Sequence, residues 1–102
     1  MYKTIFRTLS EKPRRQILTE LMESNPRSDV LTSPEDHQLT KEERERAEIA
    51  RYHIHLPMLE DTGFIEWNQD THEIVKGPNF EEIEPVLRPL HENRDELSDG
   101  WV

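Results

Sequence analysis

The longest candidate helix of the chain begins at Thr40 and ends near Gly63, and it constrains the fold more than any other segment. Thr40 followed three residues later by Glu43 is a capping-box pattern, which marks the first turn of a helix. Glycine tolerates positive φ, so Gly63 is a suitable residue to end it. Pro57 lies inside the segment and removes one backbone hydrogen bond, so we expect a bend near His53.

Apolar residues recur along this helix at helical spacing, which predicts one buried stripe. The stripe comprises Ile49, Tyr52, Leu56 and Leu59. Counting about 100° per residue, the opposite face carries Arg44, Ala47, Arg51, Ile54 and Met58, with His55 at its edge. Residues 52–56 also alternate between polar and apolar in the manner of a strand, so a break into non-helical structure is the alternative.

Two short β-prone runs follow Gly63. They span Phe64–Trp67 and His72–Val75, and the four polar residues between them predict a β-hairpin with a polar tip. Asn79 then begins a last helix, which Pro85 and Pro89 interrupt, so we expect it to be kinked or restarted and to end before Glu92.

The N-terminal part of the chain predicts two further helices. One covers Tyr2–Leu9, and the next is capped by Ser10 and carries Pro13 in its first turn. The apolar face of this second helix comprises Ile17, Leu18, Leu21 and Met22. Residues 28–39 show little periodicity and are predicted to form a loop or one short helical turn.

Composition limits what such a chain can do. The 102 residues suffice for one small domain, and only 32% of them are hydrophobic, with a mean hydropathy of -0.93. A core this small favours a partner chain. We therefore expect a homodimer formed by the apolar residues of the terminal helices, namely Ile5, Phe6, Phe80, Ile83, Leu87 and Leu90.

The residues offer no site for catalysis, metal or membrane insertion. The absence of cysteine excludes disulfides and thiolate zinc sites. His53 and His55 are two residues apart, which places them on different sides of a helix, so we expect no metal and no cofactor. No nucleophile, glycine-rich phosphate loop or acid/base pair stands out, so we do not expect an enzyme. No apolar run approaches the length of a membrane span, and we expect a cytoplasmic protein.

The charge balance is strongly acidic. Asp and Glu number 22 against 13 Lys and Arg, for a formal net charge of -9. Arginine outnumbers lysine, and an acidic, lysine-poor surface is typical of proteins from salt-loving microbes, with an acidic mesophilic protein as the alternative. Only the first 27 residues are net basic.

The order of these elements is the plan of a winged helix-turn-helix domain. The expected fold is mainly α with a β-hairpin wing, an α+β class, with extra N- and C-terminal helices. A single domain is expected over residues 1–92, with its core at 10–77 and its C-terminal helix at 79–92. Residues 93–102 are expected to form a flexible tail.

A family resemblance supports this plan. The stretch from His55 to Ile65, HLPMLEDTGFI, resembles the exit of the recognition helix into the wing in many prokaryotic winged-helix transcriptional regulators. The chain also resembles a haloarchaeal family of small winged-helix proteins of unknown function, in residues 12–18 (KPRRQIL) and 52–59 (YHIHLPML). The resemblance covers about residues 5–76. It implies a halophilic archaeon or its virus as the source.

The leading functional prediction is a homodimeric DNA-binding transcriptional regulator. On this hypothesis the long helix lies in the major groove, the wing tip enters the minor groove and a basic helix start clamps the DNA backbone. The expected contact residues are Arg14, Arg15, Arg44, Arg51, His55, Asn68 and Gln69. Glu48 lies within one turn of both Arg44 and Arg51, so a solvated, salt-bridged face is an equally good interpretation of those two arginines.

The alternative is a winged-helix interaction module that binds a protein through Ile54 and Met58 and does not bind DNA. The acidic net charge favours this alternative, because phosphate attraction normally supplies most of the affinity for DNA.

Overall fold

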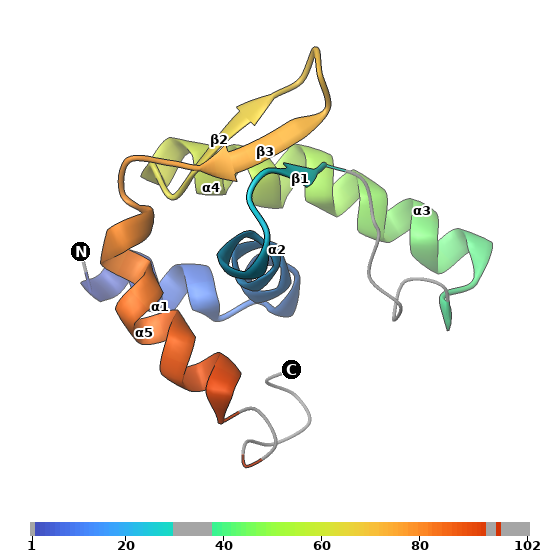
Figure 1. Ribbon diagram of the computed structural model, residues 1–102. Helices are drawn as coiled ribbons and strands as arrows, with labels where there is room; N and C mark the ends of the chain where they lie inside the picture. Colours follow the sequence, from blue (N-terminus) through green and yellow to red (C-terminus); the bar gives the residue numbers. More distant parts are fainter. Residues whose placement is uncertain (1, 30–37, 94–95, 97–102) are drawn as a thin grey trace.

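Five α-helices surround a small antiparallel sheet in the computed structural model of the chain, which describes residues 2–29, 38–93 and 96 (Figure 1). The fold is therefore α+β, as expected. Most of the predicted loop at 28–39 and nearly all of the predicted C-terminal tail lie outside the described residues. The elements in chain order are α1 (Tyr2–Leu9), α2 (Lys12–Glu23), β1 (Arg27–Ser28), α3 (Lys41–Ala50), the π-helical turn η2 (Arg51–His55), α4 (Leu56–Thr62), β2 (Ile65–Asn68), β3 (Glu73–Lys76) and α5 (Phe80–Glu92).

Helix α2 forms where the sequence predicts it, but its cap differs. The N-cap residue is Glu11, which makes no side-chain capping bond, and Pro13 occupies the first turn. The Ser10 hydroxyl instead donates to the carbonyl oxygen of Arg7 at 2.6 Å, at the end of α1. The prediction of Ser10 as the cap is therefore wrong, because its hydroxyl serves the preceding helix.

The start and end of the long helix follow the prediction. The Glu43 amide donates to the Thr40 hydroxyl at 3.1 Å, and the Thr40 amide donates to the Glu43 carboxylate at 3.2 Å, which completes the capping box. These hydrogen bonds lower the pKa of Glu43. At the other end Gly63 adopts a φ of 83°, the left-handed conformation that glycine tolerates.

A π-helical turn marks the expected disturbance before Pro57. The Leu56 amide donates to the carbonyl oxygen of Arg51, five residues earlier, so the turn η2 is wider than an α-helical turn. Proline has no amide hydrogen, and its ring collides with the carbonyl four residues earlier in an α-helix, here that of His53. The widened turn accommodates both effects, and the chain stays helical through Tyr52–Leu56 without a strand.

The widened turn also changes which side chains of the long helix face inward. An extra residue in one turn rotates the preceding segment by about 100° relative to the following one. Ile49, predicted to be buried, has a relative exposure of 59%, whereas Arg51, predicted to face outward, has only 7%. The predicted stripe is thus wrong for Ile49, whereas Tyr52 packs partly buried against the core and Leu56 and Leu59 are fully buried as predicted.

The predicted hairpin forms, with strands one residue later than expected, and a third strand joins it. The strand order is β1-β3-β2, with antiparallel pairing throughout. Ile74 of β3 lies opposite Trp67 of β2 on one side and Arg27 of β1 on the other. Strand β1 contains only Arg27 and Ser28, which is too short to show a periodic signal, so the sequence did not predict it.

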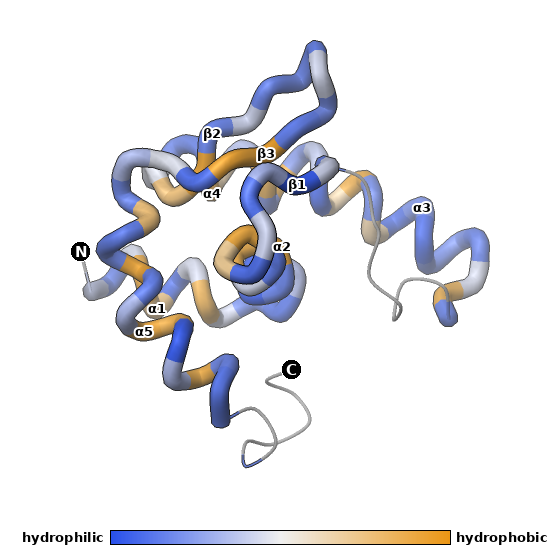
Figure 2. The backbone as a smooth tube through the Cα atoms, in the orientation of Figure 1, coloured by the Kyte–Doolittle hydropathy of each residue, from blue (hydrophilic) through white to orange (hydrophobic). Residues whose placement is uncertain are grey.

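The hydrophobic core is formed by residues of α1, α2, α4, the hairpin and α5. Figure 2 shows hydrophobic stretches in α2, β3 and α5. Helix α5 runs without interruption through two exposed prolines, Pro85 and Pro89, to Glu92, so the expected restart does not occur. Four of the six residues expected at a dimer interface are instead buried in this core: Ile5, Phe80, Ile83 and Leu87. The prediction that these residues form a dimer interface is therefore wrong, because the apolar face of α5 packs against α2 of the same chain.

Gly77 packs directly against the start of β2, which makes it the most constrained glycine of the fold. A Cβ at this position would collide with the backbone oxygen of Gly63 and would lie 2.8 Å from the backbone nitrogen of Ile65. A Cβ at Gly63 would meet only the side chain of Asn79, with added strain from the positive φ.

We predict that Gly77→Ala lowers the free energy of unfolding by about 3 kcal/mol, because backbone has to move to admit the methyl group. Gly63→Ala should cost about 1 to 2 kcal/mol, the strain of a left-handed alanine. Urea denaturation followed by circular dichroism measures both values. Equal losses in the two variants would contradict the close backbone approach at Gly77.

Candidate functional site

Two arginines expected on a DNA-contacting surface are buried and cap a helix instead. Arg14 and Arg15 have relative exposures of 7% and 8%. Arg14 donates to the carbonyl oxygen of Arg7 at 3.1 Å, and Arg15 donates to that of Leu9 at 2.6 Å. These are carbonyls of the last turn of α1, which have no partner within the helix. Because both side chains are buried, the prediction that they contact the DNA backbone is wrong. Burial also lowers the pKa of both guanidinium groups.

Two further predicted contacts, Arg51 and His55, also point inward because of the π-turn. Arg51 donates through Nε to the carbonyl oxygen of Asp29 at 2.7 Å. His55 is buried, and its Nδ1 has no hydrogen-bond partner among the described residues. Burial first, and then the charge of Arg14, lower the pKa of His55. Neither side chain is available at a groove-reading surface.

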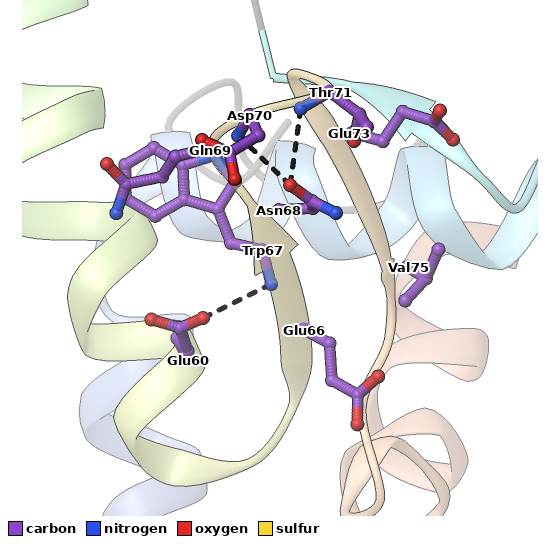
Figure 3. A pocket seen from close by; sticks show the side chains of 9 residues that line it. All are labelled: Glu60, Glu66, Trp67, Asn68, Gln69, Asp70, Thr71, Glu73 and Val75. Carbon is purple, nitrogen blue, oxygen red and sulfur yellow. Dashed lines mark hydrogen bonds between the residues drawn. The ribbon is translucent and has the colours of Figure 1, made fainter.

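Two further predicted DNA contacts, Asn68 and Gln69, lie at the hairpin tip, where the surrounding side chains are acidic. Asn68 and Gln69 are exposed, and the Asn68 side chain accepts hydrogen bonds from the amides of Asp70 at 3.0 Å and Thr71 at 3.2 Å, which shapes the turn. Figure 3 shows an open pocket at this hairpin whose lining includes four carboxylates, those of Glu60, Glu66, Asp70 and Glu73. Carboxylates in such number repel a phosphate backbone. Arg44, the last predicted contact, is half-buried on α3.

Large apolar side chains are exposed on the long helix and on α1. Ile54 has a relative exposure of 56%, which agrees with its predicted outward position, and Ile49 is equally exposed. Met58 is half-buried, and its sulfur accepts a hydrogen bond from Arg14. Of the predicted dimer residues, Phe6 is exposed and Leu90 is half-buried, and both line a groove between α1 and α5. The exposed apolar surface of the long helix is thus Ile49 with Ile54.

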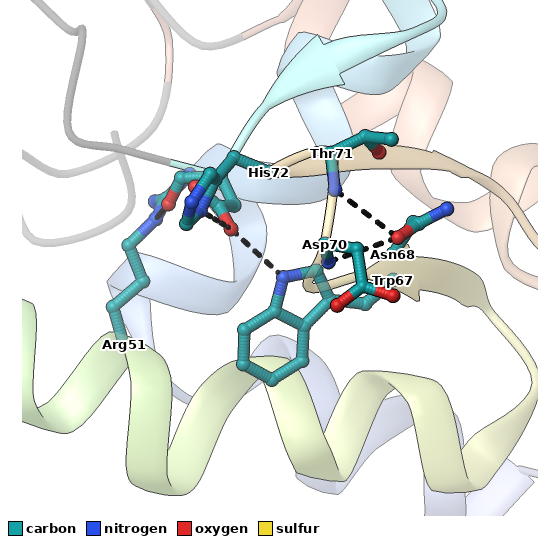
Figure 4. A network of polar contacts seen from close by, with 7 residues as sticks. Arg51, Trp67, Asn68, Asp70, Thr71 and His72 are labelled. Atoms are coloured by element: carbon teal, nitrogen blue, oxygen red, sulfur yellow. Dashed lines mark hydrogen bonds and ion pairs between the residues drawn. The ribbon is translucent and has the colours of Figure 1, made fainter.

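A polar network centred on Asp29, which no pattern in the sequence predicts, lies between the long helix and the hairpin (Figure 4). The Asp29 carboxylate is 1% exposed. Its Oδ2 accepts from Trp67 Nε1 at 3.0 Å and lies 3.3 Å from His72 Nδ1. The Asp29 amide donates to the carbonyl oxygen of His72 at 2.9 Å, and its own carbonyl accepts from Arg51. Asp29 thus joins the end of β1 to the hairpin and to η2.

Aromatic rings flank this network. Tyr52 of η2 stacks on Trp67 of β2, with ring centroids 6.1 Å apart and an interplanar angle of 27°. Burial raises the pKa of Tyr52, and the nearby negative charge of Asp29 raises it further. A single aspartate after a two-residue strand carries no sequence signal, so only the structure brings Asp29, Tyr52 and Trp67 together.

Neither a metal-ligand cluster nor a membrane-spanning helix is found among the described residues. Within the described ranges, no group of three or more His, Asp and Glu side chains is placed to hold a metal ion. In the same part of the chain, no helix combines the length and apolar character needed to cross a bilayer. A pocket beside Asp29, lined also by Tyr52, Trp67 and His72, and the exposed side chains of Ile49 and Ile54 on the long helix are features suited to binding.

Because Arg51 holds Asp29 from inside the fold, its loss should reduce stability. We predict that Arg51→Ala lowers the free energy of unfolding by about 2 kcal/mol, the range for a buried hydrogen bond from a charged donor. The matched control is Arg46→Ala, which removes an exposed ion pair of α3 with Glu42 at 3.9 Å and should cost at most about 0.5 kcal/mol. Urea denaturation distinguishes them, and an Arg51→Ala variant as stable as the wild type would refute the structural role.

The lowered pKa of His55 predicts a pH-dependent stability. Below its ordinary value of 6.5, the unfolded chain takes up a proton that the folded chain resists, so stability falls as pH falls. We expect His55→Gln to flatten the dependence of the unfolding free energy between about pH 7 and pH 5.5. His53→Gln, at an exposed position of the same turn, serves as the control. Identical pH slopes for wild type and His55→Gln would contradict the prediction.

Comparison with known proteins gives one family. Neither curated proteins nor solved structures yield a match to this chain. One family model matches residues 6–75, which include α2, the whole long helix and all of the sheet except Lys76. The matched span exceeds half of the chain, and the chain therefore belongs to the family described as a domain of unknown function, DUF7344.

Proposed function

We propose that the chain is a winged-helix interaction module that binds a protein partner through the exposed apolar face of its long helix. The winged-helix assignment is supported by the order of α2, β1, the long helix and the β2–β3 hairpin, together with the strand order β1-β3-β2. In this assignment the segment α3–η2–α4 takes the place of the recognition helix and the β2–β3 hairpin is the wing. The acidic, arginine-rich composition supports a source in a salt-loving archaeon or its virus.

The observation that carries the proposal is the exposure of Ile49 and Ile54 on one helix. They lie five residues apart, which is one turn of the widened helix around η2. Large apolar side chains exposed together mark interaction surfaces more often than single ones do. Helix α3 has no buried residue and extends away from the sheet (Figure 1), so this face is accessible.

The chemistry of the partner follows from the charges beside this face. Glu45 lies one helical turn before Ile49, Glu42 is exposed a further turn away, and the chain carries a net charge of -9. An amphipathic partner segment that combines apolar anchors with lysine or arginine is complementary to such a surface. Helix-in-groove or helix-on-helix contact is the corresponding mode of recognition.

DNA binding is the second candidate, favoured by the same order of elements and by the exposed amides of Asn68 and Gln69 at the wing tip. Its difficulty is electrostatic. Arg14, Arg15 and Arg51 are held inside, and the hairpin is lined by carboxylates. Phosphate attraction, which normally dominates affinity for DNA, has little support on this surface.

A display selection tests the protein-binding proposal. We expect random peptides selected on the folded wild-type protein to be enriched in basic and apolar residues and to lose binding about tenfold or more on Ile49→Asp/Ile54→Asp. The matched control is Glu81→Ala/Glu82→Ala, which alters an exposed site on α5 and should leave binding unchanged. Peptides that bind wild type and the Ile49→Asp/Ile54→Asp variant equally, or no enrichment at all, would refute the proposed face.

A salt titration tests whether the protein binds DNA specifically. Fluorescence anisotropy is measured with the duplex upstream of the protein's own gene and with a scrambled duplex, over a KCl series into the molar range. The proposal predicts no difference between the two duplexes at any salt. Specific binding of the upstream duplex would overturn the protein-binding proposal in favour of a DNA-reading regulator.

A further inference from the structure

We propose that the pocket beside Asp29 binds a guanidinium group, either of a free small molecule or of an arginine side chain. The pocket has a volume of about 400 Å³ and lies between η2, the end of β1 and the hairpin. Its lining includes Asp29, Tyr52, His53, Trp67, Gln69 and His72. Neither Ile49 nor Ile54 takes part, so the inference does not depend on the function proposed above.

The central observation is a buried carboxylate oxygen that accepts no hydrogen bond. Asp29 Oδ2 has two neighbours, Trp67 Nε1 and His72 Nδ1, whereas Oδ1 is buried and has no hydrogen-bond partner among the described residues. The Tyr52 hydroxyl approaches the carboxylate, but no hydrogen bond of good geometry joins it to Oδ1. A buried, unsatisfied anionic oxygen is costly, and an N–H donor in the pocket relieves that cost.

Arg51 does not fill this role, although it lies close by. Its Nε donates to the backbone carbonyl of Asp29, and the carboxylate oxygens accept no hydrogen bond from it. The Asp29 carboxylate therefore keeps one oxygen without a hydrogen bond, in a residue that lines the pocket. Among the described residues that line the pocket, the other titratable groups are His53, His72 and Tyr52, none of which carries a fixed positive charge.

The walls of the pocket select a flat cation. Tyr52 and Trp67 stack on each other, with ring planes 27° apart, and both line the pocket. A guanidinium is planar and weakly hydrated, so it can lie against an aromatic ring there while it donates to a carboxylate. An ammonium is compact and strongly hydrated, so it gains less from the rings. A metal ion is disfavoured, because a single carboxylate oxygen does not provide a coordination shell.

Tryptophan fluorescence provides a direct test. The chain has two tryptophans, and Trp101→Phe leaves Trp67 as the reporter in the pocket. Methylguanidinium, methylammonium and tetramethylammonium chlorides are titrated at constant ionic strength to about 50 mM, since a fragment this small binds weakly. We expect a saturable change with methylguanidinium, at least about fivefold weaker binding of methylammonium and none of tetramethylammonium, which has no N–H.

Asp29→Asn should weaken methylguanidinium binding about tenfold or more, because it removes the charge that the donor pairs with. Asp61→Asn, an exposed carboxylate on α4, should leave binding unchanged. If Asp29→Asn does not fold by circular dichroism, the order of the three cations on the Trp101→Phe protein decides alone. No saturable change, or equal response to the three cations, would overturn the proposal.

The source of the group is resolved by two larger probes, agmatine and the peptide acetyl-Gly-Arg-Gly-amide. Tighter binding of agmatine than of the peptide identifies a free small molecule, and the reverse identifies an arginine side chain of a protein. Both outcomes uphold guanidinium recognition. Failure of both probes to bind would overturn it, while leaving the proposed protein-binding face of Ile49 and Ile54 untouched.

Discussion

Pro57 imposes the constraint on which the arrangement of the binding surfaces depends. Its missing amide and its ring are accommodated by the π-turn η2, in which the Leu56 amide bonds to the carbonyl of Arg51. The turn rotates α3 relative to α4, so that Arg51 and His55 face the interior while Ile49 faces solvent.

Three arginines of the chain stabilise its own fold and are not available to a binding partner. Arg14 and Arg15 satisfy the last carbonyls of α1, and Arg51 holds the carbonyl of Asp29. A guanidinium does this well, because it carries several donors in a rigid fork and stays charged when partly dehydrated. Three of the 13 basic side chains are thereby withdrawn from the surface, which makes the exposed charge more acidic than the composition suggests.

The local signals of the sequence predicted most of the elements. The capping box at Thr40, the glycine at Gly63 and the polar run between two β-prone segments each depend on neighbouring residues, and each formed as expected. The faces of the long helix were not predictable in the same way. Counting 100° per residue assumes an ideal α-helix, and the sequence shows that Pro57 disturbs the helix without showing whether the helix bends, breaks or widens.

Asp29 illustrates a second limit, because its role arises from contacts distant in sequence. Its partners Trp67 and His72 lie 38 and 43 residues away, on a hairpin, and strand β1 that brings it there has only two residues. Neither spacing nor periodicity marks such a residue. The apolar spacing of α5, in contrast, indicates that Ile83 and Leu87 lie on one face of a helix, although it does not show what that face packs against.

The same network explains how a chain with a small core keeps its hairpin in place. Asp29 binds the hairpin through its amide and Oδ2 and binds the long helix through its carbonyl, so polar contacts supplement a limited apolar area. A carboxylate with one oxygen hydrogen-bonded and the other buried without a hydrogen bond is also sensitive to what enters the pocket beside it. A group bound at Oδ1 acts on the residue that sets the hairpin against the helix, so occupancy of the pocket and the position of the hairpin are energetically linked.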